Sequence, residues 1–265
     1  MTGFVASLRR MTTFVLVPGA GLGGWAWARV TPHLRAAGHD VHPITLTGTG
    51  DRAHLARPDL GIAAGATDAV AVLETEELSD VVLVGHSFGG TVISAVAERA
   101  ATRIARLVYL DAVLLQDGHS VFDDMGPGFT AVIEDLVAAH DGATLPWLTD
   151  EQLDAYYGDH GLTREDLAWM RRHATAHPVV AYRERVALRD PAAAALPRTY
   201  IRCTATPGPP RIAEGTPGWD VAALPTGHWP MVTLPEQTAA LLHAVARRQA
   251  PEMCSSSSAR SADGR

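Results

Sequence analysis

Lysine is absent from the 265-residue sequence, so arginine carries all of its fixed basic charge. Without a lysine amine, the chain has no Schiff-base nucleophile and lacks the lysine of a Walker phosphate-binding loop. Acidic residues outnumber basic ones, and the formal net charge is −7. Nucleic acids and anionic membranes are bound through basic surfaces, so we expect neither as a partner.

Cysteine is scarce, with Cys203 in a strand-like segment and Cys254 in a polar tail, and we expect no disulfide between them. Long hydrophobic runs are missing as well, and no apolar stretch reaches the length of a membrane-spanning helix. Near the N-terminus the arginines follow the apolar residues, which is the reverse of a secretion signal. These absences favour a cytoplasmic protein.

Strand and helix patterns alternate along most of the chain, which is long enough for one large α/β domain with a sizeable core. Strands are expected at 13–17, 41–46, 81–84, 104–110, 198–203 and 219–224, and helices at 25–37, 61–74, 91–99 and 235–248. This order predicts an α/β fold with a mostly parallel, doubly wound sheet. The core would comprise residues 1–112 and 196–250, followed by a disordered, low-complexity tail at 251–265.

Residues 113–195 lose this alternation and carry several aromatic side chains between acidic, helix-forming runs. We expect them to form a helical cap over the carboxyl edge of the sheet, where the apolar face of the cap would shape a substrate pocket. Within this stretch, His173 and His177 have the i, i+4 spacing of helical metal ligands. No third ligand is nearby in the sequence, so we expect a solvated helix face and no metal.

One turn organises the whole sequence. Between the strand at 81–84 and the helix at 91–99 lies Gly85-His86-Ser87-Phe88-Gly89, which leaves room only for a very tight connection. A serine on such a turn has a strained backbone, and the glycines on either side let the strand and the helix pass closely. The turn would raise the Ser87 hydroxyl above the sheet and direct the Phe88 N–H toward developing negative charge. This pattern is typical of the nucleophile elbow of the α/β-hydrolases.

The glycine-rich loop after the first strand has two interpretations. Gly19, Gly21 and Gly24 match the G-x-G-x-x-G fingerprint of dinucleotide-binding sites. In a hydrolase, the same loop supplies a second backbone N–H to the oxyanion hole. A dinucleotide site also needs an acidic residue at the end of the second strand, where this chain has Thr47 and Gly48. The hydrolase interpretation is therefore favoured.

A serine hydroxyl is a weak nucleophile that needs an imidazole base, itself oriented by a carboxylate. His228 is the histidine in the loop after the last predicted strand, where this fold places the base. The acid usually follows the preceding strand, but the loop directly after Cys203 contains no carboxylate. We assign the acid to Asp111, which follows the strand after the nucleophile, in preference to Glu214 or Asp220.

The core segments resemble the plant methylesterase and hydroxynitrile lyase branch of the α/β-hydrolases and its bacterial relatives. The resemblance rests on Phe14-Val-Leu-Val-Pro-Gly-Ala, Trp25, Val81-Val-Leu-Val-Gly-His-Ser-Phe-Gly-Gly, Tyr200-Ile-Arg-Cys-Thr and Gly227-His-Trp-Pro-Met. It implies that Ser87 and His228 are catalytic. It further implies that the backbone N–H groups of Ala20 and Phe88 form the oxyanion hole, and it allows a homodimer.

The chain departs from this branch at positions that bear on function. Thr206 stands where the acid usually follows the Cys-Thr pair, which supports the assignment to Asp111. Lyases of the branch use a threonine in the first loop and a lysine after the histidine, and here these positions hold Gly19 and Trp229. We expect these two residues, together with Leu22, to line the substrate pocket.

The sequence therefore predicts a serine hydrolase that cleaves a carboxylic ester, lactone or thioester of a small to medium apolar molecule. The reaction would proceed through an acyl-serine and would need no cofactor or metal. The alternative is a lyase, C–C hydrolase or cyclase that acts on a polyketide-like metabolite with the same Ser87 and His228. A binding protein with a degenerate hydrolase fold and an NAD-dependent oxidoreductase are the remaining alternatives.

Overall fold

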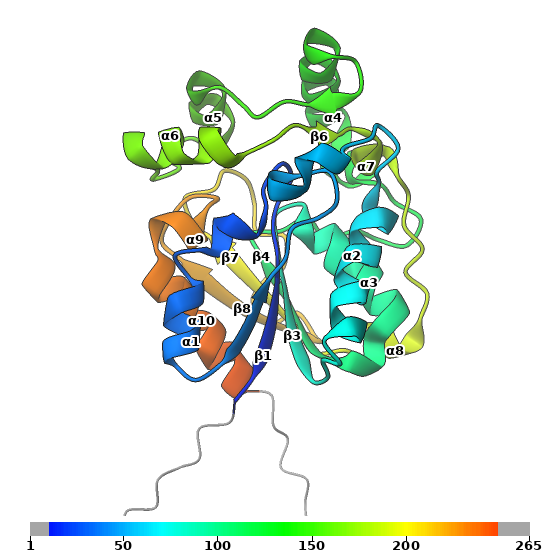
Figure 1. Ribbon diagram of the computed structural model, residues 1–265, viewed down its shortest axis with the longest axis vertical. Coiled ribbons are helices and arrows are strands. Elements are labelled where there is room, and N and C mark those ends of the chain that lie inside the picture. Colours follow the sequence, from blue (N-terminus) through cyan, green and yellow to red (C-terminus); the bar gives the residue numbers. More distant parts are fainter. Residues whose placement is uncertain (1–10, 249–265) are drawn as a thin grey trace, which may run out of the picture.

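A six-stranded parallel sheet forms the centre of the protein, whose computed structural model describes residues 11–248 (Figure 1). The strand order is β2-β1-β3-β4-β7-β8. The bounds are β1 Thr13–Val17, β2 Asp40–Pro43, β3 Val81–His86, β4 Ile104–Leu110, β7 Arg198–Cys203 and β8 Trp219–Leu224. The parallel sheet predicted from the sequence is confirmed. Cys254 and the tail at 251–265, which we expect to be disordered, lie outside the described residues.

The strands follow the hydrophobic pattern closely. All six residues of β3 are buried, as expected of a central strand in a parallel sheet that is covered on both faces. Strands β1, β4, β7 and β8 have the predicted bounds. The strand expected at 41–46 ends early, at Pro43, although the Ile44 N–H still donates to the Leu16 carbonyl at 3.1 Å. Proline is tolerated here because β2 is an edge strand.

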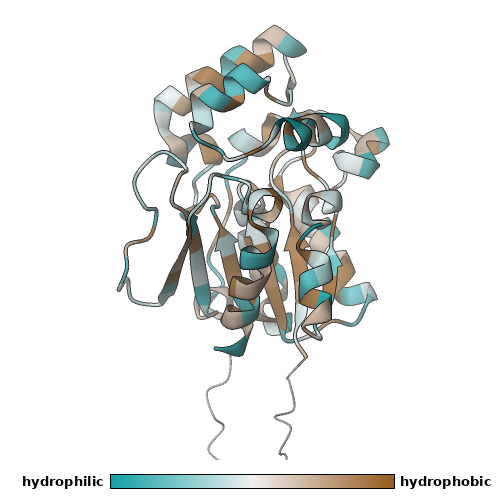
Figure 2. Ribbon diagram, turned by 90° about the vertical axis from the view of Figure 1, so that its left-hand side faces the viewer, coloured by the Kyte–Doolittle hydropathy of each residue, from teal (hydrophilic) through white to brown (hydrophobic). Residues whose placement is uncertain are grey.

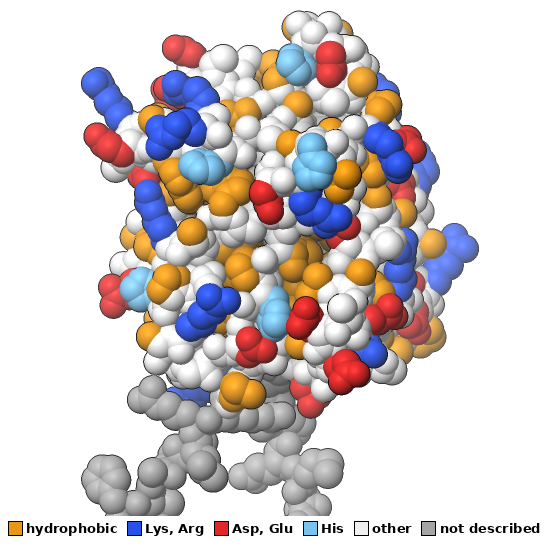
Figure 3. Space-filling view, in the orientation of Figure 1, with side chains coloured by type: hydrophobic (Ala, Val, Ile, Leu, Met, Phe, Trp, Pro, Cys, Tyr) orange, Lys and Arg blue, Asp and Glu red, His pale blue; other side chains and the backbone are white. Residues whose placement is uncertain are grey.

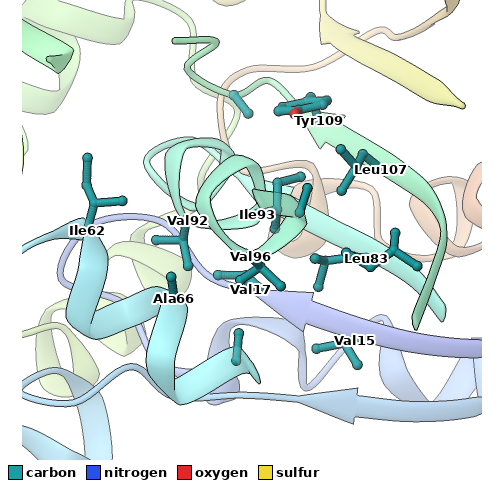
Figure 4. Close-up of a cluster of buried hydrophobic side chains, with 14 of the residues drawn as sticks. Val15, Val17, Ile62, Ala66, Leu83, Val92, Ile93, Val96, Leu107 and Tyr109 are labelled. Atoms are coloured by element: carbon teal, nitrogen blue, oxygen red, sulfur yellow. The ribbon is translucent and has the colours of Figure 1, made fainter. Parts of the chain in front are cut away.

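Helices cover both faces of the sheet. Helices α2 (Ile62–Thr75) and α3 (Gly89–Ala100) lie on one face, and α1 (Thr31–Ala36) and α10 (Pro235–Arg247) on the other (Figure 1). Figure 4 shows side chains from α2 and α3 meeting those of β1, β3 and β4 in one buried cluster. In Figure 2 the strands are brown over much of their length, whereas the helices alternate between brown and teal. Burial of these apolar stripes is the main source of stability.

The prediction of a helix at 25–37 is wrong for the first half of this range. A 3-10 turn, η1 (Gly24–Trp27), comes first, and α1 begins only at Thr31. Pro32 explains the break, because its ring would clash with a carbonyl of the preceding turn and it lacks the N–H of a helix interior. Proline is tolerated in the first turn, which is where α1 places it.

A cap lies above the carboxyl edge of the sheet (Figure 1). It contains α4 (Val121–His140), α5 (Asp150–Tyr157), α6 (Arg164–His173), α7 (Val180–Arg183) and an antiparallel pair, β5 (Thr144–Leu145) with β6 (His177–Pro178). Ser120, Thr149 and Thr163 begin the first three helices with reciprocal capping boxes, and α4 is interrupted at Gly126, where φ is +83°. The short helix α8 (Pro191–Ala194) packs beside α3.

His177 does not lie on a solvated helix face, contrary to the expectation. Helix α6 ends at the exposed His173, and the chain is extended at Ala174. His177 lies in β6, where its side chain is only 5% exposed. Pro178 contributes to this outcome, because the residue before a proline is biased toward extended backbone.

The surface carries charges of both signs. On the face shown in Figure 3, acidic side chains in red are mixed with basic side chains in blue, all of them arginines. This face therefore presents no continuous basic patch of the kind that binds nucleic acid. Across residues 11–248, none of the helices combines the length and the apolar character needed to cross a bilayer.

Candidate active site

The turn between β3 and α3 places Ser87 at the carboxyl edge of the sheet in a left-handed conformation, with φ of +53°. A Cβ on Gly85 would lie 2.5 Å from the carbonyl oxygen of Gly89, so the strand and the helix cross too closely for any side chain there. A Cβ on Gly89 would lie 2.7 Å from the carbonyl oxygen of Pro18. The absence of a side chain at Gly85 thus lets α3 pass close to β3, and its absence at Gly89 lets the end of β1 pass close to α3.

Ser87, His228 and Asp111 form one hydrogen-bonded series. The Ser87 hydroxyl lies 2.8 Å from Nε2 of His228, and Nδ1 of His228 lies 2.7 Å from Oδ2 of Asp111. His228 comes from the loop between β8 and the short helix α9 (Pro230–Thr233), and Asp111 directly follows β4. The side chain of His228 is 10% exposed and that of Asp111 is 7% exposed, so the series is largely shielded from water. An ionised Asp111 accepts from Nδ1–H, which leaves the lone pair of Nε2 facing the serine.

Two further donors hold the Asp111 carboxylate. The Cys203 N–H donates to Oδ1 at 3.0 Å, and the Thr206 hydroxyl donates to Oδ2 at 2.7 Å. Burial acts to raise the pKa of Asp111, but the bonds from His228, Cys203 and Thr206 outweigh it and keep the pKa below its ordinary value. Asp111 is therefore ionised at neutral pH.

The other two candidate acids lie elsewhere. Asp220, near the start of β8, pairs with Arg106 at 2.6 Å. Glu214 lies in an exposed turn rather than in a helix. Neither carboxylate is hydrogen-bonded to His228, whereas Asp111 is. Thr206 stands where the plant methylesterase and hydroxynitrile lyase branch usually has its acid. Here its hydroxyl donates a hydrogen bond to Asp111.

The two backbone N–H groups expected to form an oxyanion hole come from segments that meet beside Ser87. Phe88 directly follows the serine and precedes α3, whereas Ala20 lies in the loop after β1. That loop packs against the turn, because a Cβ on Gly19 would lie 3.0 Å from Cβ of Ser87. Within residues 11–248, neither the Ala20 N–H nor the Phe88 N–H donates to a protein acceptor. Both are therefore available to a ligand.

The dinucleotide interpretation of this loop lacks its structural context. The loop runs into the four-residue 3-10 helix η1 instead of an α-helix whose N-terminus would bind a pyrophosphate. The cap also occupies the outer side of the loop, because the Thr175 N–H donates to the Gly21 carbonyl at 2.9 Å. A dinucleotide would have to displace this contact.

A cavity opens beside Ser87 and His228 between the core and the cap. Gly19, Leu22 and Trp229, the expected pocket residues, all line it. The cap adds residues that sequence reasoning did not identify, namely Leu145, Trp147, Tyr157, His177 and Tyr182 among others. The aromatic content of 113–195 indicated a cap of this kind. No local pattern marked the individual residues, because their positions depend on how the cap packs on the core.

Aromatic side chains surround the imidazole of His228. The Tyr157 ring stacks on it with centroids 4.8 Å apart and an interplanar angle of 20°, and burial raises the pKa of Tyr157 to about 12. His86 lies beneath it, and its Nε2–H donates to the backbone carbonyl of His228 at 2.7 Å. Burial, followed by the proximity of His228, lowers the pKa of His86 to about 3. Tyr157 and His86 are therefore both neutral at pH 7.

Sequence comparisons identify relatives over most of the chain. A model of the alpha/beta hydrolase family matches residues 14–241. A carbendazim hydrolyzing esterase from Nocardioides sp. (strain SG-4G) is 33% identical over 241 residues, which cover 89% of this chain and 100% of that protein. Methylesterase 1 of Arabidopsis thaliana is 34% identical over 123 residues, which cover 44% of this chain and 47% of that protein.

Solved structures share the fold. An extracellular alpha/beta-hydrolase from a Paenibacillus species has a TM-score of 0.76 at 25% identity, with 87% of this chain and 97% of that chain covered. A pyrethroid hydrolase from Sphingobium faniae has a TM-score of 0.67 at 25% identity, with 90% and 98% covered. Tomato methylketone synthase I has a TM-score of 0.71 at 19% identity, with 91% and 100% covered, and this likeness concerns the fold alone.

We expect the free energy of unfolding to fall as the pH is lowered from 7 toward 4. Burial lowers the pKa of His86 to about 3 and that of His177 to about 4, whereas an unfolded histidine titrates near about 6.5. Between these values the unfolded state binds protons that the native state does not, so stability rises with pH and this contribution is complete above about pH 7. Near pH 5 the two histidines together should contribute a slope of about 2–3 kcal/mol per pH unit.

Urea unfolding at pH 7, 6 and 5 measures this slope. His177→Phe removes one of the two buried imidazoles and should remove about half of the histidine contribution. His54→Gln, at an exposed position, is the matched control and should keep the wild-type slope. A slope that is the same in the wild type and in His177→Phe would contradict a neutral, buried His177.

Proposed function

Because the chain belongs to the alpha/beta hydrolase family, we propose that it cleaves a carboxylic ester, lactone or thioester of a small to medium apolar molecule through an acyl-serine. The observation that carries the proposal is the hydrogen-bonded series from Ser87 through His228 to Asp111, which opens at the serine into an aromatic cavity. The chemistry of such a series needs no cofactor.

In the first half of the reaction, the Ser87 oxygen attacks the carbonyl carbon of the bound substrate, while Nε2 of His228 takes the hydroxyl proton. The oxygen of the carbonyl becomes negatively charged and accepts hydrogen bonds from the Ala20 and Phe88 N–H groups. When the tetrahedral species collapses, His228 returns the proton to the departing alcohol or thiol. Each oxyanion donor typically contributes about 10²–10³ in turnover in such sites.

In the second half, a water molecule takes the place of the departed group. Nε2 of His228 removes a proton from this water, whose oxygen attacks the acyl carbon, and the same imidazole then protonates Ser87 as the acid leaves. Asp111 stays ionised throughout, since it orients the neutral imidazole and stabilises the imidazolium that forms twice in each cycle. Cys203 and Thr206 keep the carboxylate in place through their hydrogen bonds.

The composition of the cavity supports an apolar substrate. Trp147, Tyr157, Tyr182 and Trp229 are the largest side chains that line it, and aromatic walls favour flat or hydrophobic ligands. Two relatives are named for small-molecule substrates, namely a carbendazim hydrolyzing esterase and a pyrethroid hydrolase. A small-molecule ester is therefore the proposed partner of this site.

Covalent labelling tests the acyl-serine. The wild type should gain the mass of one phosphonyl group on exposure to a fluorophosphonate, and it should release a burst of p-nitrophenol from a p-nitrophenyl ester. Ser87→Ala and His228→Ala should show neither, because they lack the nucleophile and its base. Ser79→Ala, at an exposed position, is the matched control and should behave as the wild type. Turnover without an adduct would instead favour a lyase or cyclase that uses Ser87 and His228 only as a base.

Relocation of the acid tests the role of Asp111. Asp111→Asn should lower kcat by about 10³–10⁴, because an amide at this position favours the wrong tautomer of His228. Thr206→Asp in the Asp111→Asn background should recover at least about tenfold of that loss, since the hydroxyl of Thr206 lies 2.7 Å from the carboxylate oxygen that binds His228. Thr206→Asn in the same background has the same size without the charge and should recover nothing. Wild-type kcat in Asp111→Asn would exclude Asp111 as the acid.

A further inference from the structure

Resting on the proposed ester hydrolysis, we propose that His177 of the cap determines substrate specificity: its Nε2–H donates a hydrogen bond to an oxygen or nitrogen acceptor that the substrate carries near the scissile carbonyl. The preferred substrates are then esters with a second polar atom on an otherwise apolar body. This is a property of the cap, separate from the series of Ser87, His228 and Asp111.

The protonation of His177 follows from its partner. The Gly21 N–H lies 3.3 Å from Nδ1 of His177, and a backbone N–H can only donate, so Nδ1 carries the lone pair. A neutral imidazole has one proton, which must therefore be on Nε2. The ring stays neutral because burial lowers the pKa of His177 to about 4. At neutral pH the residue thus presents a fixed N–H donor.

This donor has no acceptor within the part of the chain that the structure describes. Among residues 11–248, buried Nε2 of His177 finds no hydrogen-bond partner, although the side chain is only 5% exposed. The neighbouring rings of Phe88 and Tyr182 meet it edge-on, with centroids 4.6 Å and 5.9 Å away. Buried polar atoms are nearly always paired in native proteins. His177 lines the same cavity as Ser87, so a substrate acceptor can supply the partner that the described residues do not.

The imidazole is held at a set position relative to the oxyanion loop. The Thr175 N–H donates to the Gly21 carbonyl at 2.9 Å, and the Thr175 hydroxyl accepts from the Gly50 N–H at 3.2 Å. Together with the bond from Gly21 to His177, these contacts tie the segment that enters β6 to the residue after Ala20. A substrate whose carbonyl oxygen sits at the Ala20 N–H would therefore meet the His177 donor in a predetermined place.

The experiment uses pairs of esters that differ only by exchange of a methylene group for an oxygen. On the acyl side the pair is p-nitrophenyl butyrate and p-nitrophenyl methoxyacetate, and on the alcohol side it is butyl acetate and 2-methoxyethyl acetate. The ratio of kcat/KM for the ether to kcat/KM for the alkyl ester is measured in the wild type and in each variant. Differences in intrinsic reactivity are the same for every variant, so they cancel when these ratios are compared.

Two substitutions separate recognition from loop positioning. His177→Asn keeps an acceptor near the position of Nδ1 for the Gly21 N–H and removes the donor at Nε2. His177→Gln extends an amide N–H to the position of Nε2 and loses the acceptor for Gly21. In one of the two pairs, the ratio should fall about tenfold in His177→Asn, mainly through the ether substrate, and should stay within about threefold of the wild type in His177→Gln.

An unchanged ratio in His177→Asn for both pairs would overturn the proposal, as would an equal loss on all four esters, which indicates a purely structural role. The rate of fluorophosphonate labelling shows whether each variant keeps an intact serine site. Failure of the proposed ester hydrolysis gives a different result, because the wild type would then hydrolyse none of the four esters and form no adduct. That result would overturn the specificity proposal as well.

Discussion

The crossing of three backbones at Ser87 is the constraint on which the site depends. Strand β3 enters the turn, α3 leaves it and the end of β1 passes beside it, and the distances at Gly85 and Gly89 leave no space for a side chain at either position. The same turn is bonded to the next strand, because the Ser87 N–H donates to the Leu110 carbonyl at 3.2 Å and the Val113 N–H donates to the Ser87 carbonyl at 3.0 Å. The loop that carries Asp111 is therefore held directly against the turn at Ser87.

The position of Asp111 shows that the carboxylate bound to His228 can come from more than one loop of the sheet edge. An imidazole needs an ionised oxygen at Nδ1 and does not depend on which loop supplies it. Here Asp111 approaches from β4, with φ of +44°, and Thr206 in the neighbouring loop has become a donor to it. The hydrogen bonds around the carboxylate, rather than its position in the sequence, keep it ionised in a buried place.

The cap takes part in the site as well as covering it. Thr175 and His177 are hydrogen-bonded to Gly21, so the loop that carries the Ala20 N–H is fixed partly by residues more than 150 positions later in the chain. Tyr157 of α5 stacks on the imidazole of His228. Changes in cap packing would therefore reach both the Ala20 N–H and His228. In the proposed ester hydrolysis, these contacts would couple substrate choice to the geometry of the reacting groups.

The sequence by itself determined the parts that rest on local patterns. Four strands have their predicted bounds, and the strand, the Gly85-x-Ser87-x-Gly89 turn and the helix could be recognised because turn chemistry and hydrophobic period act over a few residues. His228 and Asp111 could be singled out because strand order places their loops at one edge. Tertiary structure alone decided that Asp111 reaches His228 while Glu214 does not, and that His177 is buried beside Phe88. These outcomes depend on contacts between distant segments, which no local pattern encodes.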